Sequence, residues 1–297
     1  MKINPEILSG FHLIENENLK NQSTIKIGGY AKNFLIPETE TELIELINLL
    51  DAHKEKYIIF GRGSNIIFAD TMKTEHVIST KSINKIQMEL DIISVQAGQS
   101  LRELCYLCAR EGYSGLEGLS GIPGTVGGGA YMNAGAYGYT FSDSIREIRA
   151  YDRKSRKIIS LNNKECHFDY RKSIFMNTDQ VILSVSLALK KQESEEIKKR
   201  MAAYEHKRAM SQPLDMPSAG SVFKKPFKDF YTARIIEELG LKGFCIGDAC
   251  VSEKHAGFIV NKKMATSRDV KQLMAYIVEQ VYEKTGERLS AEIEFFE

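Results

Sequence analysis

Apolar residues recur at intervals of three and four in two segments of the first half of the chain, residues 39–54 and 100–112. This spacing places them on one face of a helix. Thr39 and Glu42 open the first segment as a capping box, in which each side chain binds a backbone amide at the start of a helix. The pattern therefore predicts two amphipathic helices.

Strand signals fill most of the remaining first 190 residues. Runs that are rich in β-branched and aromatic residues alternate with clusters of turn residues. The predicted strands and hairpins cover residues 57–60, 66–70, 76–80, 91–98, 144–162 and 180–190. This part of the chain is predicted to be strand-rich, with few helices.

The pattern changes after the charged run at residues 190–200. Longer helical periods follow, and two of them end at Gly240 and Gly286, as helices commonly end at a glycine. We therefore place a domain boundary in this run, with residues 1–190 in one domain and residues 191–297 in another.

Residues 288–297 alternate between two sets of side chains. A period of two is typical of a strand, in which successive side chains point to opposite faces. We predict a terminal strand with Glu292 on the face away from the core.

Composition limits the classes of protein to consider. The 297 residues are 43% hydrophobic and 27% charged, which is ordinary for a globular protein. Forty basic and 39 acidic residues leave a net charge of +1, so no overall field favours nucleic acid or an anionic membrane. The N-terminus has no signal-peptide pattern, and no apolar run approaches the ~18 residues of a membrane span. We expect a cytoplasmic protein without membrane insertion.

The five cysteines are an odd number in a chain without a secretory signal, so we predict free thiols. Cys105 and Cys108 share a helix face with leucines, and we interpret them as part of an apolar stripe rather than a redox or metal site. His255 is interpreted as a hydrogen-bonded core histidine. The other histidines show no metal-ligand spacing, so no metal is predicted.

Glycine is concentrated in GLSGIPGTVGGGAYMNAGAYG, residues 118–138, which hold eight of the 22 glycines and no charged residue. A second short stretch, GRGSN at 61–65, lies between two predicted strands. Glycine lets backbone amides approach a ligand closely, and consecutive amides can bind an anion. The P-loop and Rossmann patterns are both absent. The sequence predicts a dinucleotide pyrophosphate at these loops, with side-chain donors from Ser64, Asn65, Thr125 and Asn133.

Six motifs together resemble the UDP-N-acetylenolpyruvoylglucosamine reductase family. They are NQSTIKIGGYAKNFLIP, GRGSNIIFAD, the glycine-rich stretch above, YRKSIF, SAGSVFKKP and VSEKHAGFIVN, in order from about residue 21 to residue 294. The GIPG-containing stretch and GSVFKKP are specific in combination, whereas GRGSN also occurs in other flavoproteins of the same fold. The 49 residues between Arg171 and Ser221 resemble the branch of the family without an extra tyrosine loop.

The resemblance implies an α+β fold, in which an FAD-binding domain of the PCMH type, like that of vanillyl-alcohol oxidase, precedes a C-terminal α+β substrate domain. It implies non-covalent FAD, with NADPH as hydride donor, and a monomer or weak oligomer. The implied cofactor-binding residues are Gly61, Arg62, Gly63, Ser64, Asn65, Gly121, Ile122, Gly124, Thr125, Gly127, Gly128 and Asn133.

The implied reaction is the reduction of UDP-N-acetylglucosamine enolpyruvate to UDP-N-acetylmuramate in peptidoglycan synthesis. Arg171 is expected to hold the substrate carboxylate, because a guanidinium binds carboxylates with two hydrogen bonds. Ser221 matches the proton donor, and Glu292 is expected to polarise the enol or bind the carboxylate. The implied substrate contacts are Tyr170, Lys224 and Lys225.

Two other classes of function remain open. A different flavoenzyme of the same fold, such as an alcohol or hydroxy-acid oxidase, would share the first domain, but GSVFKKP would have no role in it. A non-catalytic nucleotide-binding module would keep the glycines and leave Arg171, Ser221 and Glu292 unexplained.

Overall fold

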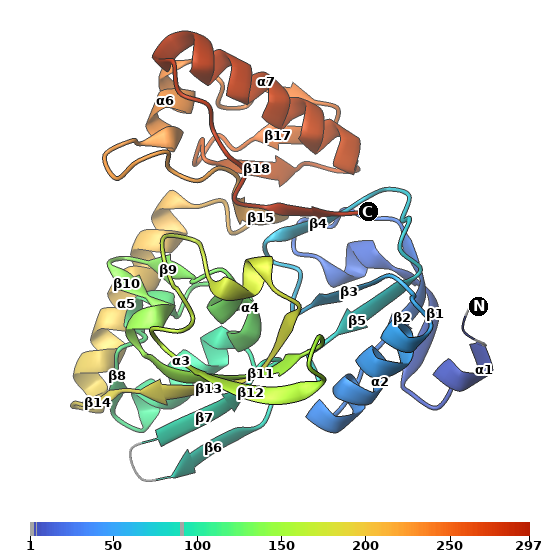
Figure 1. Cartoon of the computed structure of the whole chain (residues 1–297). Coiled ribbons are helices and arrows are strands. Elements are labelled where there is room, and N and C mark those ends of the chain that lie inside the picture. Colours follow the sequence, from blue (N-terminus) through green and yellow to red (C-terminus); the bar gives the residue numbers. More distant parts are fainter. Residues whose placement is uncertain (1–2, 4, 90–91) are drawn as a thin grey trace. The chain divides into compact units, whose positions relative to one another are not determined.

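The structure is a computed structural model that describes residues 3, 5–89 and 92–297. It divides into two compact units (Figure 1). Unit 1 comprises Met1–Ile14, Asn33–Arg62 and His76–Lys207, and unit 2 comprises Glu15–Lys32, Gly63–Glu75 and Arg208–Glu297. Two segments from the first quarter of the chain thus group with its C-terminal part. A single domain boundary in the sequence cannot describe units that are each built from several segments. The roles predicted for residues 1–190 and 191–297 stay a prediction.

Both amphipathic helices predicted from the first half are present, and both helices predicted to end near Gly240 and Gly286 are present too, although the first of these has only 7 residues. The α-helices of the described ranges are α1 (Pro5–Leu8), α2 (Glu40–Ala52), α3 (Leu101–Arg110), α4 (Val126–Tyr131), α5 (Ser194–Ser211), α6 (Thr232–Glu238) and α7 (Ser267–Thr285). The Thr39 hydroxyl caps α2 by accepting a hydrogen bond from the Glu42 amide at 3.1 Å, as predicted, but the Glu42 carboxylate accepts from the Glu38 amide at 2.7 Å and does not complete the predicted capping box with Thr39. Gly286 ends α7 with a left-handed φ of 77°. None of these helices has the length and apolar character needed to cross a bilayer.

Strands occur in every segment where the sequence predicts them, although Asp91, the first residue of one predicted strand, lies outside the described residues. In unit 1 or shared by both units are β1 (Leu13–Asn18), β2 (Tyr30–Leu35), β3 (Tyr57–Phe60), β5 (His76–Ser79), β6 (Ile86–Glu89), β7 (Ile92–Gln96), β8 (Tyr113–Ser114), β9 (Gly135–Ala136), β10 (Tyr139–Thr140), β11 (Ile145–Asp152), β12 (Lys157–Asn162), β13 (Gln180–Ala188) and β14 (Lys190–Lys191). In unit 2 are β4 (Ile66–Phe68), β15 (Ser218–Ser221), β16 (Cys245–Ile246), β17 (Ala249–Val251), β18 (Phe258–Asn261) and β19 (Glu294–Phe296).

Two larger sheets organise unit 1. The first has the order β1-β2-β5-β3, and its β2, β5 and β3 run parallel. The apolar face of α2 packs against this sheet in a cluster that includes Leu35, Leu46 and Ile78. The second sheet, β12-β11-β13-β7-β6, is antiparallel, and α3 and α4 share its core (Figure 1). The glycine-rich stretch includes α4 and is therefore anchored in that core.

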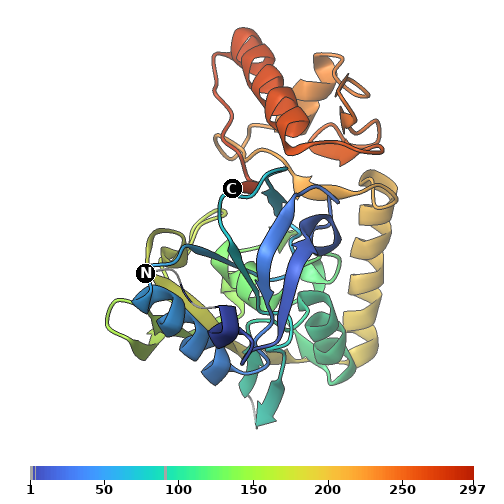
Figure 2. The same cartoon turned by 90° about the vertical axis from the view of Figure 1, so that its right-hand side faces the viewer.

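Unit 2 is built around the antiparallel sheet β15-β18-β17-β16. Figure 2 shows α7 lying over this sheet, and α7 buries Val270, Leu273, Ile277 and Val281 in the core of the unit. A second pairing joins β19, at the end of the chain, to β4 in parallel. The second glycine-rich loop, which leads into β4, is therefore tied to the C-terminal segment.

Candidate functional site

Within unit 1, Gly61 packs closely against the longer glycine-rich stretch. A Cβ placed on Gly61 would lie 2.2 Å from the Thr125 hydroxyl oxygen, so only glycine fits at this point. Gly63, with φ of +63°, approaches a different segment, because its Cβ would lie 2.2 Å from the Gln22 carbonyl oxygen. The glycines of residues 61–65 therefore serve close backbone packing as well as any ligand.

Around α4, Gly127 and Gly128 have different surroundings. A Cβ on buried Gly127 would lie 2.8 Å from the Ala97 Cβ, and the Gly127 amide donates to the Ala97 carbonyl at 2.8 Å. A Cβ on exposed Gly128 would have one close neighbour, the Thr125 hydroxyl at 3.4 Å. Packing thus explains glycine at position 127. At position 128 the protein leaves room for a ligand to approach the backbone.

The rest of this stretch also fits a bound dinucleotide. Gly124 has φ of +139°, a conformation that other residues rarely adopt, and Gly121 and Ile122 are half-buried beside it. The fully buried Ser120 hydroxyl has no hydrogen-bond partner among the described residues. Native proteins seldom leave such a group unsatisfied unless water or a ligand reaches it.

The side chains of Thr125, Asn133 and Asn65, all predicted as ligand donors, form hydrogen bonds within the protein. The Thr125 hydroxyl accepts from the Gly128 amide at 3.2 Å and caps α4. The Asn133 amide donates to the Asp169 carbonyl at 3.0 Å. The Asn65 amide donates to the Glu292 carbonyl at 3.0 Å. These side chains shape the loops, so a cofactor would meet mainly glycine backbone.

In unit 2, Ser221 and Glu292 lie on neighbouring backbone segments. The Glu292 amide donates to the carbonyl of Val222, the residue after Ser221, at 2.7 Å. The register of β15 against β18 shifts between Ser218 and Ser221, as in a β-bulge. Gly220 on this bulge has φ of +82°, and its Cβ position has no neighbour within 4 Å among the described residues. A β-bulge changes the direction in which nearby side chains point, and this bulge leaves open space next to Ser221.

The predicted terminal strand is shorter than its alternation suggested. Ala291 forms an isolated bridge with Phe223, whereas β19 begins at Glu294 and pairs with β4 instead. Glu292 therefore lies in a bend before the strand, not on the strand as predicted. The chain changes partners at this point, and a change of partner has no signature in local alternation.

Glu294 and the two predicted lysines lie near this bend. Burial raises the pKa of the Glu294 carboxyl, and the charge of Lys224 acts in the opposite direction. The Lys224 amide donates to the Ser290 carbonyl at 2.9 Å. The exposed Lys225 ammonium lies 4.9 Å from the centroid of the Tyr231 ring. Unit 2 thus carries cationic groups on the segment that follows Ser221.

Arg171 belongs to unit 1, where the glycine-rich stretch holds its guanidinium. Its Nη2 donates to the Gly135 carbonyl at 2.8 Å, and its Nη1 donates to the Asn133 carbonyl at 3.4 Å. The guanidinium also lies 5.2 Å from the ring of exposed Tyr170. Neither the Gly135 contact nor the left-handed φ of +51° at Arg171 was anticipated from the sequence.

A buried ion pair fixes the start of the glycine-rich stretch, and it too was missed. Glu117 is 1% exposed, and its carboxylate accepts from Arg200 at 2.7 Å, from the Ser114 hydroxyl at 2.7 Å and from the Gly115 amide at 2.8 Å. Although burial acts to raise the pKa of Glu117, these bonds lower it below its ordinary value. The sequence does show a glutamate immediately before the glycines. Its partner, Arg200, is 83 residues away, so the ion pair could not be recognised from the local sequence.

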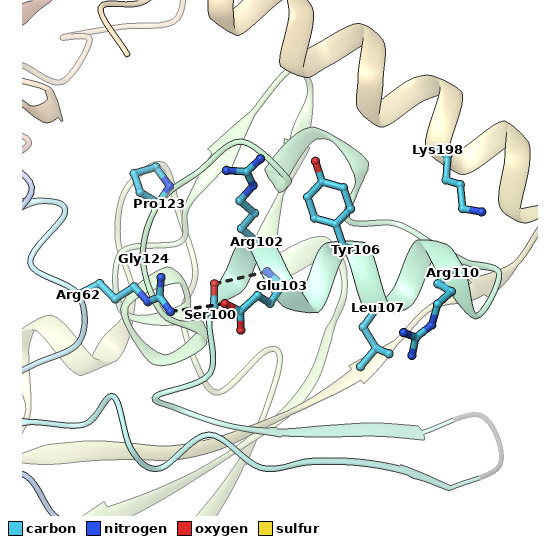
Figure 3. Close-up of a pocket in the computed structure, with 10 residues that line it drawn as sticks. All are labelled: Arg62, Ser100, Arg102, Glu103, Tyr106, Leu107, Arg110, Pro123, Gly124 and Lys198. Atoms are coloured by element: carbon cyan, nitrogen blue, oxygen red, sulfur yellow. Dashed lines mark hydrogen bonds and ion pairs between the residues drawn. The ribbon is translucent and has the colours of Figure 1, made fainter. Parts of the chain in front are cut away.

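A pocket of about 860 Å³ lies beside the loops in unit 1, and Arg62 and Gly124 line it (Figure 3). Its other cations are Arg102, Arg110 and Lys198. Carboxylates lie near most of these charges: Glu103 at 3.7 Å from Arg62, Glu111 at 2.9 Å from Arg110, and Glu195 at 2.8 Å from Lys198. The pocket therefore offers little uncompensated charge for an anion.

The cysteine prediction is partly wrong. Cys245 and Cys250 form a disulfide across the β16–β17 hairpin, whereas free thiols were predicted throughout. An odd total does not exclude one pair when a hairpin brings two cysteines opposite each other. Cys105 and Cys108 are free and buried in the core, as predicted, and burial raises the pKa of both thiols.

His255 is hydrogen-bonded as predicted, since its Nδ1 accepts from the Gly257 amide at 3.1 Å, but it is half-buried rather than part of the core, and this burial lowers its pKa. Within the described ranges, no group of three or more histidine, cysteine or acidic side chains is arranged to hold a metal ion.

Comparison with known proteins covers both halves of the chain. Residues 31–160 match the model of an FAD binding domain, and residues 212–296 match the C-terminal domain of UDP-N-acetylenolpyruvoylglucosamine reductase. A reductase of that name from Thermosipho melanesiensis is 44% identical over 95% of this chain and 94% of its own length. The chain belongs to the UDP-N-acetylenolpyruvoylglucosamine reductase family. A further member, from Petrotoga mobilis, is 41% identical over 97% of this chain and 95% of its own length.

Solved structures agree with this assignment. The crystal structure of the family member from Thermus caldophilus superposes with a TM-score of 0.82 at 33% identity, covering 97% of this chain and all of that chain. A cholesterol oxidase from Brevibacterium sterolicum reaches a TM-score of 0.50 at 13% identity over 64% of this chain and 40% of its own, which is a likeness of fold alone. Family membership confirms the α+β fold with an FAD-binding domain, and it decides against the oxidase and the non-catalytic module.

The contrast between Gly127 and Gly128 gives a test of the cofactor loop. We expect Gly128→Ala to fold at least as stably as the wild type, because alanine favours a helix over glycine by about 1 kcal/mol and its Cβ meets no clash. Its flavin content should nevertheless fall. Gly127→Ala should instead lower the melting temperature of the apoprotein, because its Cβ collides with Ala97. Melting temperature and flavin-to-protein ratio after gel filtration separate the two, and full flavin retention by Gly128→Ala would remove that residue from the cofactor site.

Proposed function

We propose that Arg171, Ser221 and Glu292 carry out in this chain the reaction of its family. That reaction is the NADPH-dependent, FAD-mediated reduction of UDP-N-acetylglucosamine enolpyruvate to UDP-N-acetylmuramate, a step of peptidoglycan synthesis. The observation that carries the proposal is the adjacency of Ser221 and Glu292, 71 residues apart in sequence, around the hydrogen bond from the Glu292 amide to the Val222 carbonyl.

The reduction requires the transfer of a hydride and of a proton to the substrate. Bound FAD supplies the hydride, which NADPH replenishes, and glycine backbone at residues 61–65 and 121–128 would hold the cofactor. As the terminal carbon of the enolpyruvyl group is reduced, negative charge develops beside the substrate carboxylate. A guanidinium fixed by two backbone carbonyls, as in Arg171, suits that carboxylate, because pre-oriented donors stabilise developing charge best.

Ser221 is the group we assign to protonate the carbon beside the carboxylate. Support comes from the open space at Gly220, which allows close approach of a ligand. Serine is a weak acid, but an enolic carbanion is a strong base, and the charge of Lys224 or Lys225 favours the alkoxide that remains. Glu292 is assigned to orient or polarise the enol group.

The substrate contacts and the cellular context complete the proposal. Tyr170 in unit 1 and Lys224 and Lys225 in unit 2 are assigned to the nucleotide-sugar substrate, the lysines because phosphates attract cations. Residues 1–190 are assigned to FAD and residues 191–297 to substrate. We further propose a cytoplasmic enzyme that acts as a monomer or weak oligomer.

Anaerobic half-reactions test the function directly. The purified protein should be yellow, its flavin absorbance should bleach with NADPH, and the UDP-enolpyruvyl sugar should restore the colour with formation of UDP-N-acetylmuramate. A preparation that bleaches but is not reoxidised by this sugar would contradict the assigned substrate. A preparation that neither contains nor takes up FAD would contradict the cofactor.

A further inference from the structure

The loop that carries Arg171 is fastened to the glycine-rich stretch at three points within unit 1. The Asn133 side-chain amide donates to the Asp169 carbonyl at 3.0 Å, and the Arg171 Nη2 donates to the Gly135 carbonyl at 2.8 Å. The Ser173 hydroxyl donates to the Tyr131 carbonyl. Arg171 is therefore placed both by its own tight turn, in which the Asp169 and Lys172 backbones exchange hydrogen bonds at 3.1 and 3.2 Å, and by contacts with a segment almost 40 residues away.

Asn133 takes part in the contacts of this loop through both its side chain and its backbone. It is 4% exposed, and both ends of its side chain are used, because its Oδ1 accepts from the Ser142 amide at 3.0 Å while its Nδ2 binds Asp169. Its own carbonyl accepts from Arg171 Nη1. Its φ of +46° lies in the left-handed region, which asparagine tolerates better than most side chains. The side chain thus joins three segments, and the backbone beside it faces the guanidinium.

Arg171 itself is held in an unfavourable conformation. Its φ of +51° is uncommon for a residue with a long side chain, and such conformations persist where the surrounding structure imposes them. Two N–H groups of its fork donate to the Asn133 and Gly135 carbonyls, which fixes the plane of the guanidinium. A Cβ at Gly135 would lie 2.8 Å from the Tyr139 carbonyl oxygen and 3.3 Å from Nη1, so glycine there serves the packing of its hairpin first and leaves room for the fork as well.

We infer that Asn133 is a positioning residue for Arg171, and that it acts through the Asp169 carbonyl and its own carbonyl rather than as a contact of the cofactor. This inference rests on the proposed function, in which Arg171 holds the substrate carboxylate. It replaces the cofactor-binding role that the sequence suggested for Asn133. Loss of the side chain leaves the guanidinium present but free to leave its productive orientation.

The first test compares Asn133→Gly with Asn163→Ala. Glycine keeps the left-handed backbone available and removes both side-chain hydrogen bonds. Asn163 is a matched control, because its side chain donates to the Ser142 and Ile145 carbonyls at 2.7 and 2.8 Å and is bonded to neither Asp169 nor Arg171. Asn133→Asp is a second, conservative variant that keeps the acceptor and loses the donor.

In anaerobic stopped-flow experiments, we expect both Asn133 variants to retain flavin and to bleach with NADPH at nearly the wild-type rate. Reoxidation by the UDP-enolpyruvyl sugar should slow by roughly 10–10²-fold, the scale of effect of a misplaced catalytic group, and should need more substrate for half-saturation. Asn163→Ala should match the wild type in both half-reactions. Loss of flavin, or a slowing of bleaching equal to that of reoxidation, would indicate that Asn133 contacts the cofactor. Unchanged reoxidation would show that Asn133 does not position Arg171.

A double variant separates positioning from general loosening of the fold. If Asn133 acts through the fork of Arg171, then adding Asn133→Gly to Arg171→Lys should change reoxidation less than about twofold, because the fork is already gone. Multiplied effects of the two changes would overturn the inference. A wild-type enzyme that this sugar fails to reoxidise would overturn the proposed function itself, which distinguishes the two failures.

Discussion

Ser221→Ala should bleach with NADPH at close to the wild-type rate and then be reoxidised slowly by the UDP-enolpyruvyl sugar. Hydride transfer into the flavin requires no proton from this serine, whereas completing the reduction of substrate requires one at the carbon beside the carboxylate. A positioned general acid contributes ~10²–10⁴-fold to a rate, and we expect a loss in that range. Stopped-flow absorbance of the flavin measures both half-reactions in one preparation.

The control for Ser221→Ala lies on the same strand. Ser218 begins β15, three residues before Ser221, and its carbonyl accepts from the Thr24 hydroxyl at 2.7 Å. Because that bond uses backbone, Ser218→Ala should keep the strand and the activity. Wild-type product formed in deuterated solvent should carry deuterium at the carbon beside the carboxylate. Normal turnover of Ser221→Ala with the same labelling would mean that the proton has another source.

Local patterns in the sequence predicted the elements of this fold well. The period of the apolar residues placed α2, α3, α6 and α7, and the caps at Thr39 and Gly286 marked two ends correctly. These features depend on residues within one or two turns of each other. The motifs likewise led to the family, because each keeps its residues contiguous.

Features that depend on long-range pairing were not predictable in this way. The Asn65–Glu292 hydrogen bond joins residues 227 apart, and it accompanies the change of partner that ends the predicted terminal strand early. The same pairing groups residues 63–75 with the C-terminal part of the chain, so the units are not continuous in sequence. The Cys245–Cys250 disulfide depends on hairpin register, which the count of cysteines does not reveal.

Roles of individual polar residues in the loops were the least predictable. Thr125 and Asn133 were predicted as phosphate donors because they stand among glycines, and each also uses its side chain to build the loop, so their contact with a cofactor stays a prediction. A polar residue in a glycine-rich loop must satisfy the backbone groups that the glycines leave exposed, and this competes with ligand binding. The distinction between the two uses needs the partner's position, which only the folded chain supplies.

Arg171→Lys should bleach normally with NADPH and be reoxidised by the UDP-enolpyruvyl sugar roughly 10²–10³-fold more slowly, a loss comparable to removal of an oriented donor from a developing anion. Lysine keeps the positive charge but loses the planar fork, so it cannot hold the Gly135 carbonyl and a carboxylate in fixed planes together. The left-handed φ at this position is no less suited to lysine than to arginine, so stability should change little. Arg149→Lys is the control, because Arg149 pairs with Glu40 at 3.1 Å in the same unit and should retain full activity. If Arg171→Lys reoxidises like the wild type, charge alone suffices and the oriented guanidinium has no part in the reaction.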